Sequence, residues 1–414
     1  DAYDRAKDLI NTDRYALALR WTALDTANQT LVAGLDMNRA TNLDEFKTAL
    51  KNYYAPMQNI VMADTNGNIA YRAIGAVPKR NKGQGLYGVA PALGWEKQYD
   101  WNGYLPFDEL PASNNPEQGW IATANQQIIA SNNPNPLTAD WDVPTRYDRI
   151  VQMIKERSTH DTQYIKTMQG DTLSLGATPL LELFKSSQPK HTLGAKALEI
   201  TKNFDGNMSI DSPSALIFNA WADQLTRNVF SRLSYLFYEN YGARNYRFPL
   251  ISILQNPNSP WCDIPNTPAV ETCAESSNIA FDRALEYLSE QYGNDPKSWS
   301  WGKAHIAISE HRPLSKIPVL GKFFNITTPF PGDSFSVNVG RLELNNSQNP
   351  FETLQAPSLR AIYDLSDLEK SLFIYQAGQS GWVQSPWYRN MNSLWAKNEY
   401  LPLQMKPEKT THTL

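Results

Sequence analysis

The pattern of apolar and polar positions divides the chain into a strand-rich beginning, a helical middle and a strand-rich end. Five stretches repeat apolar residues at helical intervals, at 146–156, 178–188, 194–204, 213–241 and 278–293. Short apolar runs separated by Gly, Pro and Asn clusters then indicate strands, at 305–312, 335–344, 358–365 and 371–378. We therefore expect an α+β protein. Its sheet-based core, at 1–145 and 299–414, is interrupted by a large helical insertion at 146–298.

Within the first part, residues 1–15 have helical spacing without a clear cap, and residues 16–24 (ALALRWTAL) read as a strand. Asn42, followed three residues later by Glu45, predicts the start of a helix that ends at Pro56. Apolar runs on both sides of Asn66-Gly67 (NG) predict a β-hairpin closed by a tight type I′ turn.

Composition changes this picture by exclusion. The chain of 414 residues is 41% hydrophobic and 19% charged, which is typical of a globular protein. The 38 basic and 42 acidic residues leave a net charge of -4 and form no run of like charge. Nucleic acid and anionic membrane are therefore not expected partners, because both require a concentrated basic face. No apolar run reaches the ~18 residues that a membrane-spanning helix needs.

No common catalytic motif accompanies these elements. The sequence lacks a Gly-x-Ser-x-Gly elbow, a His-Glu-x-x-His pair and a phosphate-binding loop. Asp64, Asn66 and Asn68 look like half of a calcium loop, but the required carboxylate position falls on Gly75. Among the five histidines, only His305 and His311 are close in sequence, and without an acid at ligand spacing we interpret them as structural.

The two cysteines, Cys262 and Cys273, lie in a Pro- and Asn-rich loop. Two reduced thiols remain an alternative. A short irregular loop gains from covalent closure, by roughly 2–3 kcal/mol in the chain-entropy model, which favours a disulfide and hence an oxidising compartment. A zinc site is disfavoured because no second pair of ligands accompanies the cysteines.

Four segments resemble consecutive blocks of the penicillin amidase family: DTNGNIAY (64–71), DWNGYLPFDELP (100–111), NNPEQGWIATANQ (114–126) and WDVPTRYDRI (141–150). WSWGKAH (299–305) and GQSG (378–381) resemble blocks of its acyl-homoserine lactone acylases. The resemblance implies part of the αββα sandwich of N-terminal-nucleophile hydrolases. It also implies a periplasmic or secreted acylase that cleaves a linear amide, either an N-acyl-homoserine lactone or a penicillin, and it agrees with a disulfide.

In that family the nucleophile is a serine at the free N-terminus of the large chain, upstream of these blocks. This sequence starts at Asp1, with no signal peptide before it. We therefore expect a later portion of the large chain that does not turn over substrate alone. Its expected partners are the small (alpha) chain and the upstream part of the large chain, and its targeting segment is expected to have been removed.

The resemblance assigns two catalytic residues. Asn125, aligned on IATANQ, corresponds to the asparagine whose amide donates to the oxyanion, and loss of one such donor typically costs ~3–4 kcal/mol in the barrier. An asparagine that only satisfies a turn is the alternative. Arg146, in WDVPTR, corresponds to an arginine near the nucleophile, where its fork can hold Asn125 or the substrate carbonyl. Arg149 is expected to face away into a salt bridge.

The family's chemistry needs no cofactor, but calcium is a family feature. Where relatives carry a carboxylate, this chain has Asn132, Asn133 and Asn135, whose amides bring no charge, so the metal stays open. Gln379 and Ser380 are candidate hydrogen-bond donors behind the site. The substrate-binding residues are not identified.

Two other functions remain alternatives to the acylase. One is a non-catalytic secreted binding protein that retains the fold without the nucleophile. The other is a carbohydrate-binding or scaffolding protein, suggested only by the 12 tryptophans.

Overall fold

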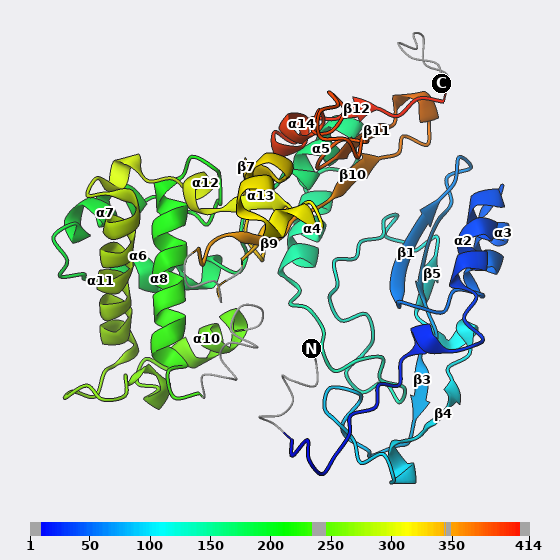
Figure 1. Cartoon of the computed structure of the whole chain (residues 1–414), viewed down its shortest axis with the longest axis horizontal. Coiled ribbons are helices and arrows are strands. Elements are labelled where there is room, and N and C mark those ends of the chain that lie inside the picture. Colours follow the sequence, from blue (N-terminus) through cyan, green and yellow to red (C-terminus); the bar gives the residue numbers. More distant parts are fainter. Residues whose placement is uncertain (1–9, 234–245, 343, 345–348, 406–414) are drawn as a thin grey trace. The chain divides into compact units, whose positions relative to one another are not determined.

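The computed structural model describes residues 10–233, 246–342, 344 and 349–405. Its elements are β-strands, α-helices and short 3₁₀ helices, so the predicted α+β class is confirmed (Figure 1). The chain forms two compact units, Asp1–Asp142 and Val143–Leu414. The expected division into two core segments and a helical insertion stays a prediction. Among the described residues, no helix combines the length and apolarity that crossing a membrane requires.

The first unit is built around a small antiparallel sheet in the order β1-β2-β5. Helices α2 and α3 contribute apolar side chains to the same core as β1 and β2, and a separate pair, β3 and β4, lies further along the chain (Figure 1). The bounds are α2 (Thr30–Arg39), α3 (Leu43–Leu50), β1 (Gln58–Ala63), β2 (Ile69–Ile74), β3 (Pro78–Arg80), β4 (Trp101–Tyr104) and β5 (Ala112–Asn114).

The predicted hairpin is confirmed as β1-β2, but the type I′ turn is wrong. Only Gly67 of the Asn-Gly pair has a positive φ, +85°, whereas a type I′ turn needs two such residues. The Asp64 carboxylate accepts from the N–H groups of Asn66 and Asn68, both at 2.9 Å. The Asp64 side chain therefore holds together a longer loop, residues 64–68, between β1 and β2, in place of the expected two-residue turn.

The predicted start of α3 is confirmed and its predicted end is wrong. Asn42 caps the helix by accepting from the N–H groups of Asp44 and Glu45. The helix ends at Leu50, well before Pro56. The N–H groups of Tyr54 and Ala55 instead donate to the Thr30 hydroxyl, at 3.0 and 3.1 Å. A tertiary hydrogen bond to the start of α2 therefore takes this segment out of the helix.

The beginning of the chain departs further from expectation. Residues 1–9 of the expected first helix lie outside the described residues, and 10–15 form a bend and turns. No strand occupies 16–24, where the only regular element is a short 3₁₀ turn, η1 (Thr22–Leu24).

The second unit begins with the predicted helices. All five predicted helical stretches contain helix. The second, third and fourth end earlier than predicted, at Ser186, Thr201 and Val229, and residues 234–241 of the fourth lie outside the described residues. Helices α8 and α11 run beside one another and share the largest core (Figure 1). The bounds are α4 (Thr145–Lys155), α5 (Thr162–Gln169), η4 (Thr178–Leu180), α6 (Leu181–Ser186), α7 (Gly194–Thr201), α8 (Pro213–Val229), α10 (Arg247–Leu254), α11 (Cys273–Tyr292) and α12 (Trp301–Ala304).

Strands return after α12, as predicted. One sheet has the order β7-β6-β9-β8 and a second the order β10-β11-β12. The bounds are β6 (Ile306–Ser309), α13 (Pro318–Phe324), β7 (Ile326–Pro329), β8 (Arg341–Leu342), β9 (Thr353–Gln355), β10 (Leu359–Ile362), β11 (Leu372–Tyr375), α14 (Asn392–Ala396) and β12 (Leu401–Pro402).

In the described residues of the expected strand at 335–344, which are 335–342 and 344, only the two residues of β8 are strand. Asp333, which is fully buried, accepts from the N–H groups of Phe335 and Ser336 at 2.8 and 3.0 Å. A side chain therefore satisfies backbone groups that a strand ladder would otherwise use, and the chain turns at this point.

Candidate functional site

Asn125 lies at a bend in an irregular segment of the first unit. Residues 115–142, all of which the structure describes, form neither helix nor strand. Asn125 is exposed and has a φ of +69°, a left-handed conformation that asparagine adopts more readily than most residues. Its carbonyl oxygen accepts from the Asp142 N–H at 3.2 Å. The backbone thus gives a direct reason for asparagine at a turn, and the side chain lies at the surface of its unit.

The segment around Asn125 is attached to regular structure at its start and near its end. Asn115 accepts from the Ile69 N–H at 2.8 Å and donates to the Asn68 side chain at 3.0 Å, which joins the segment to the hairpin. Further on, Leu137 packs against a small buried cluster of Val77, Leu105 and Leu110. The loop that carries Asn125 is therefore held by hydrogen bonds and packing although it has no regular secondary structure.

Arg146 is the second residue of α4 in the other unit and is half-buried. It follows Asp142 by four positions in the sequence. Because Asn125 and Arg146 belong to different units, their meeting at one site stays a prediction.

Arg149, one helical turn after Arg146, behaves as expected. Its guanidinium donates to both carboxylate oxygens of Asp171, at 3.1 and 2.9 Å. This bidentate pair raises the pKa of Arg149, and Glu156 lies 3.5 Å away on another side of the guanidinium. The predicted salt bridge is confirmed, and it attaches α4 to the segment after α5.

The calcium candidates lie on an exposed part of the same irregular segment. The side-chain oxygen of Asn133 accepts from the Asn135 N–H at 2.8 Å, so part of this oxygen's capacity is already used. Within the described part of the chain, no group of three or more His, Cys, Asp or Glu side chains could hold a metal ion. Asn132, Asn133 and Asn135 alone are a poor ligand set because they supply no carboxylate. A calcium site here stays a prediction.

Loop 378–388, which contains Gln379 and Ser380, is compactly folded. The Ser380 N–H donates to the Trp387 carbonyl at 3.2 Å, and its hydroxyl oxygen accepts from the Trp382 N–H at 3.1 Å. A Cβ at position 378 would collide with the Trp387 carbonyl oxygen, which explains the glycine there. The suggested role of Gln379 and Ser380 behind a catalytic site stays a prediction.

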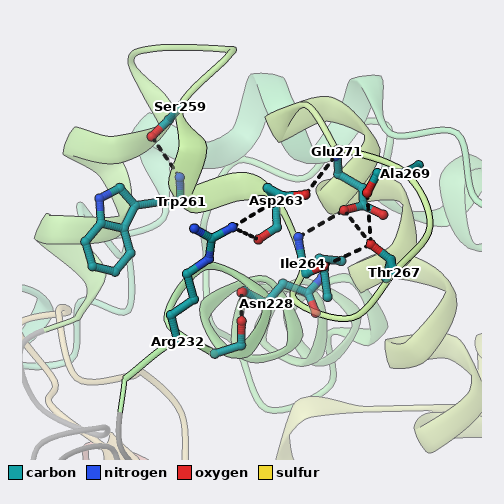
Figure 2. Close-up of polar contacts among 10 residues, drawn as sticks. Asn228, Arg232, Ser259, Trp261, Asp263, Ile264, Thr267, Ala269 and Glu271 are labelled. Atoms are coloured by element: carbon teal, nitrogen blue, oxygen red, sulfur yellow. Dashed lines mark hydrogen bonds and ion pairs between the residues drawn. The ribbon is translucent and has the colours of Figure 1, made fainter.

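The predicted disulfide between Cys262 and Cys273 is confirmed. Figure 2 shows that the loop between the cysteines has its own polar network. Arg232 donates to the Asp263 carboxylate at 2.6 Å, and buried Glu271 accepts from the Ile264 N–H at 2.9 Å. The loop is therefore closed both covalently and by hydrogen bonds.

His305 is fully buried and makes structural contacts, as we expected. Its ring stacks on Trp301 at 4.5 Å, and Nδ1 lies 2.7 Å from the Phe351 carbonyl, to which an Nδ1–H donates. Burial lowers the pKa of His305 to about 4. A neutral imidazole packed in this way joins α12 to the segment before β9.

A buried group of charged side chains around α8 was not foreseen. Asp223 accepts from the Arg227 Nε at 2.8 Å, and Asp333 accepts from the Ser174 hydroxyl at 2.6 Å. Burial raises the pKa of both carboxyls, and the nearby Arg247 guanidinium opposes that rise. The spacing of Asp223 and Arg227 is the only sequence signal for this group. Acids and arginines balance here, which is typical of a structural cluster.

Comparison with known proteins shows which family the chain resembles. The sequence model of the penicillin amidase family matches residues 7–412. The acyl-homoserine lactone acylase QuiP of Pseudomonas aeruginosa is 26% identical over 427 residues, covering 95% of this chain and 50% of the relative. QuiP of Pseudomonas fluorescens (strain Pf0-1) is 29% identical, covering 95% and 49%. The penicillin acylase 2 proenzyme of Pseudomonas sp. (strain SE83) is 24% identical, covering 89% and 46%.

The fold is also that of a solved relative. A thermostable penicillin G acylase from Alcaligenes faecalis superposes with a TM-score of 0.65 at 19% identity, over 94% of this chain and 73% of the other. This likeness confirms the expected fold. The chain spans about half the length of the curated relatives it matches.

Proposed function

The chain belongs to the penicillin amidase family, and from this premise we propose that the protein is an acylase that hydrolyses a linear amide. The observation that carries the proposal is the family match over residues 7–412, with relatives named as lactone acylases and penicillin acylases. The proposed substrates are N-acyl-homoserine lactones or penicillin-type amides. Their hydrolysis would remove a quorum signal (quorum quenching) or modify an antibiotic.

The nucleophile of this proposal is an N-terminal serine outside these 414 residues. Its α-amine takes the proton of its own hydroxyl, and the oxygen attacks the amide carbonyl carbon. The C–N bond then breaks, the amine leaves with the proton, and an acyl-serine ester remains. Water hydrolyses the ester and releases the carboxylic acid. The segment that carries the serine and the small chain are the proposed partners.

This chain's own contribution would begin with Asn125. A tetrahedral intermediate carries a negative oxygen, which needs a donor already in place. The Asn125 amide can donate without titrating. Its exposure and its position within the family-like block 114–126 support this role. The left-handed backbone at Asn125 fixes where the side chain leaves the loop, so the turn and the donor are compatible functions of one residue.

Arg146 would act on Asn125 or on the substrate carbonyl. A guanidinium has donors and no acceptor, so it can bond only to the oxygen of an amide. If it holds the Asn125 oxygen, the NH₂ group is directed away from the arginine and toward the oxyanion. Its position in the first turn of α4 gives its backbone a rigid support.

A periplasmic or secreted location is proposed for this acylase. The disulfide between Cys262 and Cys273 supports it, because such bonds persist in oxidising compartments. The proposed chemistry requires no cofactor, and a structural calcium ion is not needed for any step.

The test uses the full-length protein and the 414-residue chain side by side. Each is incubated with an N-acyl-homoserine lactone and with a penicillin, and release of the free amine is followed. We expect turnover from the full-length protein, an acyl-enzyme in its intact mass, and no turnover from the 414-residue chain. Binding of either compound by the full-length protein without hydrolysis would instead identify a non-catalytic binding protein.

A further inference from the structure

Helix α13 carries large apolar side chains on the surface of the second unit. Val319 and Phe323 are 79% and 55% exposed and lie one helical turn apart, so they share a face of the helix. Ile317 and Leu320 beside them are 48% and 36% exposed. Single exposed apolar residues are normal at a protein surface, whereas several on one short helix mark an interaction site. We call these four residues the α13 patch.

Hydrogen bonds at its C-terminal end fix α13 to the rest of its unit. The Tyr388 hydroxyl donates to the Phe324 carbonyl at 2.7 Å, and the Arg389 guanidinium donates to the Phe323 carbonyl at 3.1 Å. The half-buried Phe324 packs its ring against His311, with centroids 4.9 Å apart. The α13 patch is therefore presented by a helix that is held in place.

The loop that precedes Tyr388 adds exposed aromatic rings. Trp382 and Trp387 are 66% and 50% exposed, although the loop that carries them is compactly folded. Tryptophan is favoured at the boundary between water and lipid, because its ring is apolar and its N–H is polar. The type of side chain in this loop thus agrees with that of the α13 patch.

Charge is distributed unevenly around this surface. Residues 311–332 and 371–398 contain no Asp or Glu. The lysines and arginines of these two segments are all exposed: Arg312, Lys316, Lys322, Arg389 and Lys397. The nearest acid before them, Glu310, lies 3.9 Å from Arg312. The net charge of -4 disfavours an anionic membrane for the chain as a whole, but this region is locally basic.

We propose that the α13 patch binds the surface of an anionic phospholipid bilayer. The apolar side chains of the patch enter the outer part of the lipid layer, while the long basic side chains around it stay level with the lipid phosphates. The contact is peripheral, and among the described residues no helix is able to cross a membrane. This inference goes beyond the proposed acylase and does not depend on it.

Charge and apolarity together favour this occupant over two others. A nucleic acid would use the basic residues, but it has no need of exposed Val319 and Phe323. A second copy that used the same patch would bring Lys316 and Lys322 toward their own counterparts, and like charges repel. Anionic lipid accommodates both the apolar and the basic side chains.

Flotation of the full-length protein with lipid vesicles tests the proposal. Vesicles of phosphatidylglycerol and phosphatidylcholine in equal parts are compared with vesicles of phosphatidylcholine alone, at low and high salt. We expect binding to the anionic vesicles to be about 10-fold or more tighter, and to weaken as salt screens the charges. No binding to the anionic vesicles, or equal binding to both kinds, would overturn the proposal.

A first pair of variants tests the apolar side chains. The double substitution Val319→Ser with Phe323→Ser should weaken binding to the anionic vesicles by about 10-fold or more, because two inserted apolar side chains are lost. Val270→Ser with Leu354→Ser, at 83% and 52% exposed positions outside the patch, is the matched control and should bind like the wild type. Loss of binding in both double variants, or in neither, would contradict the proposed patch.

A second pair of variants tests the basic residues. Lys316→Gln with Lys322→Gln should weaken binding to the anionic vesicles by about 10-fold and reduce its salt dependence, while binding to neutral vesicles stays unchanged. Lys196→Gln with Lys202→Gln is the control, because Asp295 and Glu199 already pair with these lysines. Equal weakening in both double variants would assign the binding to total charge and overturn the patch.

The remaining outcomes distinguish other occupants and the enzymatic function. If Val319→Ser with Phe323→Ser halves the mass of the protein in solution, a second copy covers the patch and the proposal is wrong. Binding by the 414-residue chain but not by the full-length protein would show that other polypeptide covers it, and would also overturn the proposal. Vesicle binding without hydrolysis of any amide leaves this inference and overturns the acylase, whereas hydrolysis without vesicle binding does the reverse.

Discussion

The two units of this chain differ in how completely they bury their apolar helices and strands. In the second unit, α8 buries 13 of its 17 residues, including Phe218 and Trp221. In the first unit, α2 buries only Ala33 among its 10 residues and exposes Leu31 and Leu35. A helix that is buried on most of its sides needs neighbours for its polar residues as well as its apolar ones, and α8 has them within its own unit.

The same difference is seen in the aromatic and apolar side chains of the two units. The aromatic core of the second unit pairs Phe184 with Phe281 at 5.3 Å and with Trp221 at 5.0 Å. The first unit carries exposed apolar residues, an irregular stretch at 15–21 and the loop of Asn125. We interpret the second unit as the more stable of the two, because it buries its apolar side chains in its own core. Four predictions test this comparison.

The largest expected effect is on the core of the second unit. Trp221→Ala removes a fully buried ring and its hydrogen bond to the Ser277 hydroxyl, and should lower the free energy of unfolding by about 3–5 kcal/mol. Urea denaturation followed by circular dichroism measures this. Trp95→Ala, at a 67% exposed position of the first unit, is the matched control and should cost under ~1 kcal/mol. Similar losses from both would break the comparison.

The next prediction separates the two roles of Asn125. In the full-length protein, Asn125→Asp keeps the shape and Asn125→Gly tolerates the positive φ, but both remove the amide donor. Each should lower kcat by about 10²- to 10³-fold while the urea midpoint stays unchanged. Asn132→Asp, at another exposed asparagine of the same segment, should retain activity. Full activity in Asn125→Gly would exclude Asn125 as the oxyanion donor and leave it only a structural role in the turn.

Because His305 is buried in the second unit, the stability of that unit should depend on pH. Its pKa is lowered to about 4 by burial, whereas an unfolded histidine titrates near 6.5. Between these values the unfolded chain binds a proton that the folded chain does not. Stability should therefore fall by up to ~1.4 kcal/mol per pH unit as the pH drops from 6.5 to 4, then level off.

The measurement is the difference between wild type and His305→Gln across that pH range. Subtraction removes the carboxylates common to both proteins. The exposed His160 provides the control, because His160→Gln should leave the slope unchanged. An identical slope in wild type and His305→Gln would exclude His305 as its source.

The smallest effect is expected at the cysteine loop. Replacing Cys262 and Cys273 with serine should lower the free energy of unfolding by about 2–3 kcal/mol in the chain-entropy model. The polar network in Figure 2 remains, so the loop should stay folded in native buffer. Arg232→Ala, which breaks the partly exposed ion pair with Asp263, should cost under ~1 kcal/mol. If Arg232→Ala lowered the free energy of unfolding as much as the double cysteine substitution, the ion pair and not the disulfide would be the main stabilising link of the loop.

Local patterns determined much of this protein. The helical stretches of the middle, the strands after Trp299, the cap at Asn42 and the short ring of Cys262 and Cys273 were all predicted. Each depends on residues close in sequence, so period, capping chemistry and ring size are sufficient. The family-like blocks around Asn125 and Arg146 are equally visible, although the meeting of those two residues in space is not.

Side-chain hydrogen bonds decided the rest. Asp64 and Asp333 use their carboxylates to hold backbone N–H groups two to four residues further along the chain, which replaces the type I′ turn and shortens the strand at 335–344. Thr30 holds the chain after α3. Residues 16–24 have the pattern of a strand, but in the described part of the chain they join no sheet. Sequence determines which face of an element is apolar. Only the folded structure decides whether a nearby carboxylate or a distant hydroxyl holds the backbone N–H groups, because the spacing of apolar residues does not encode that choice.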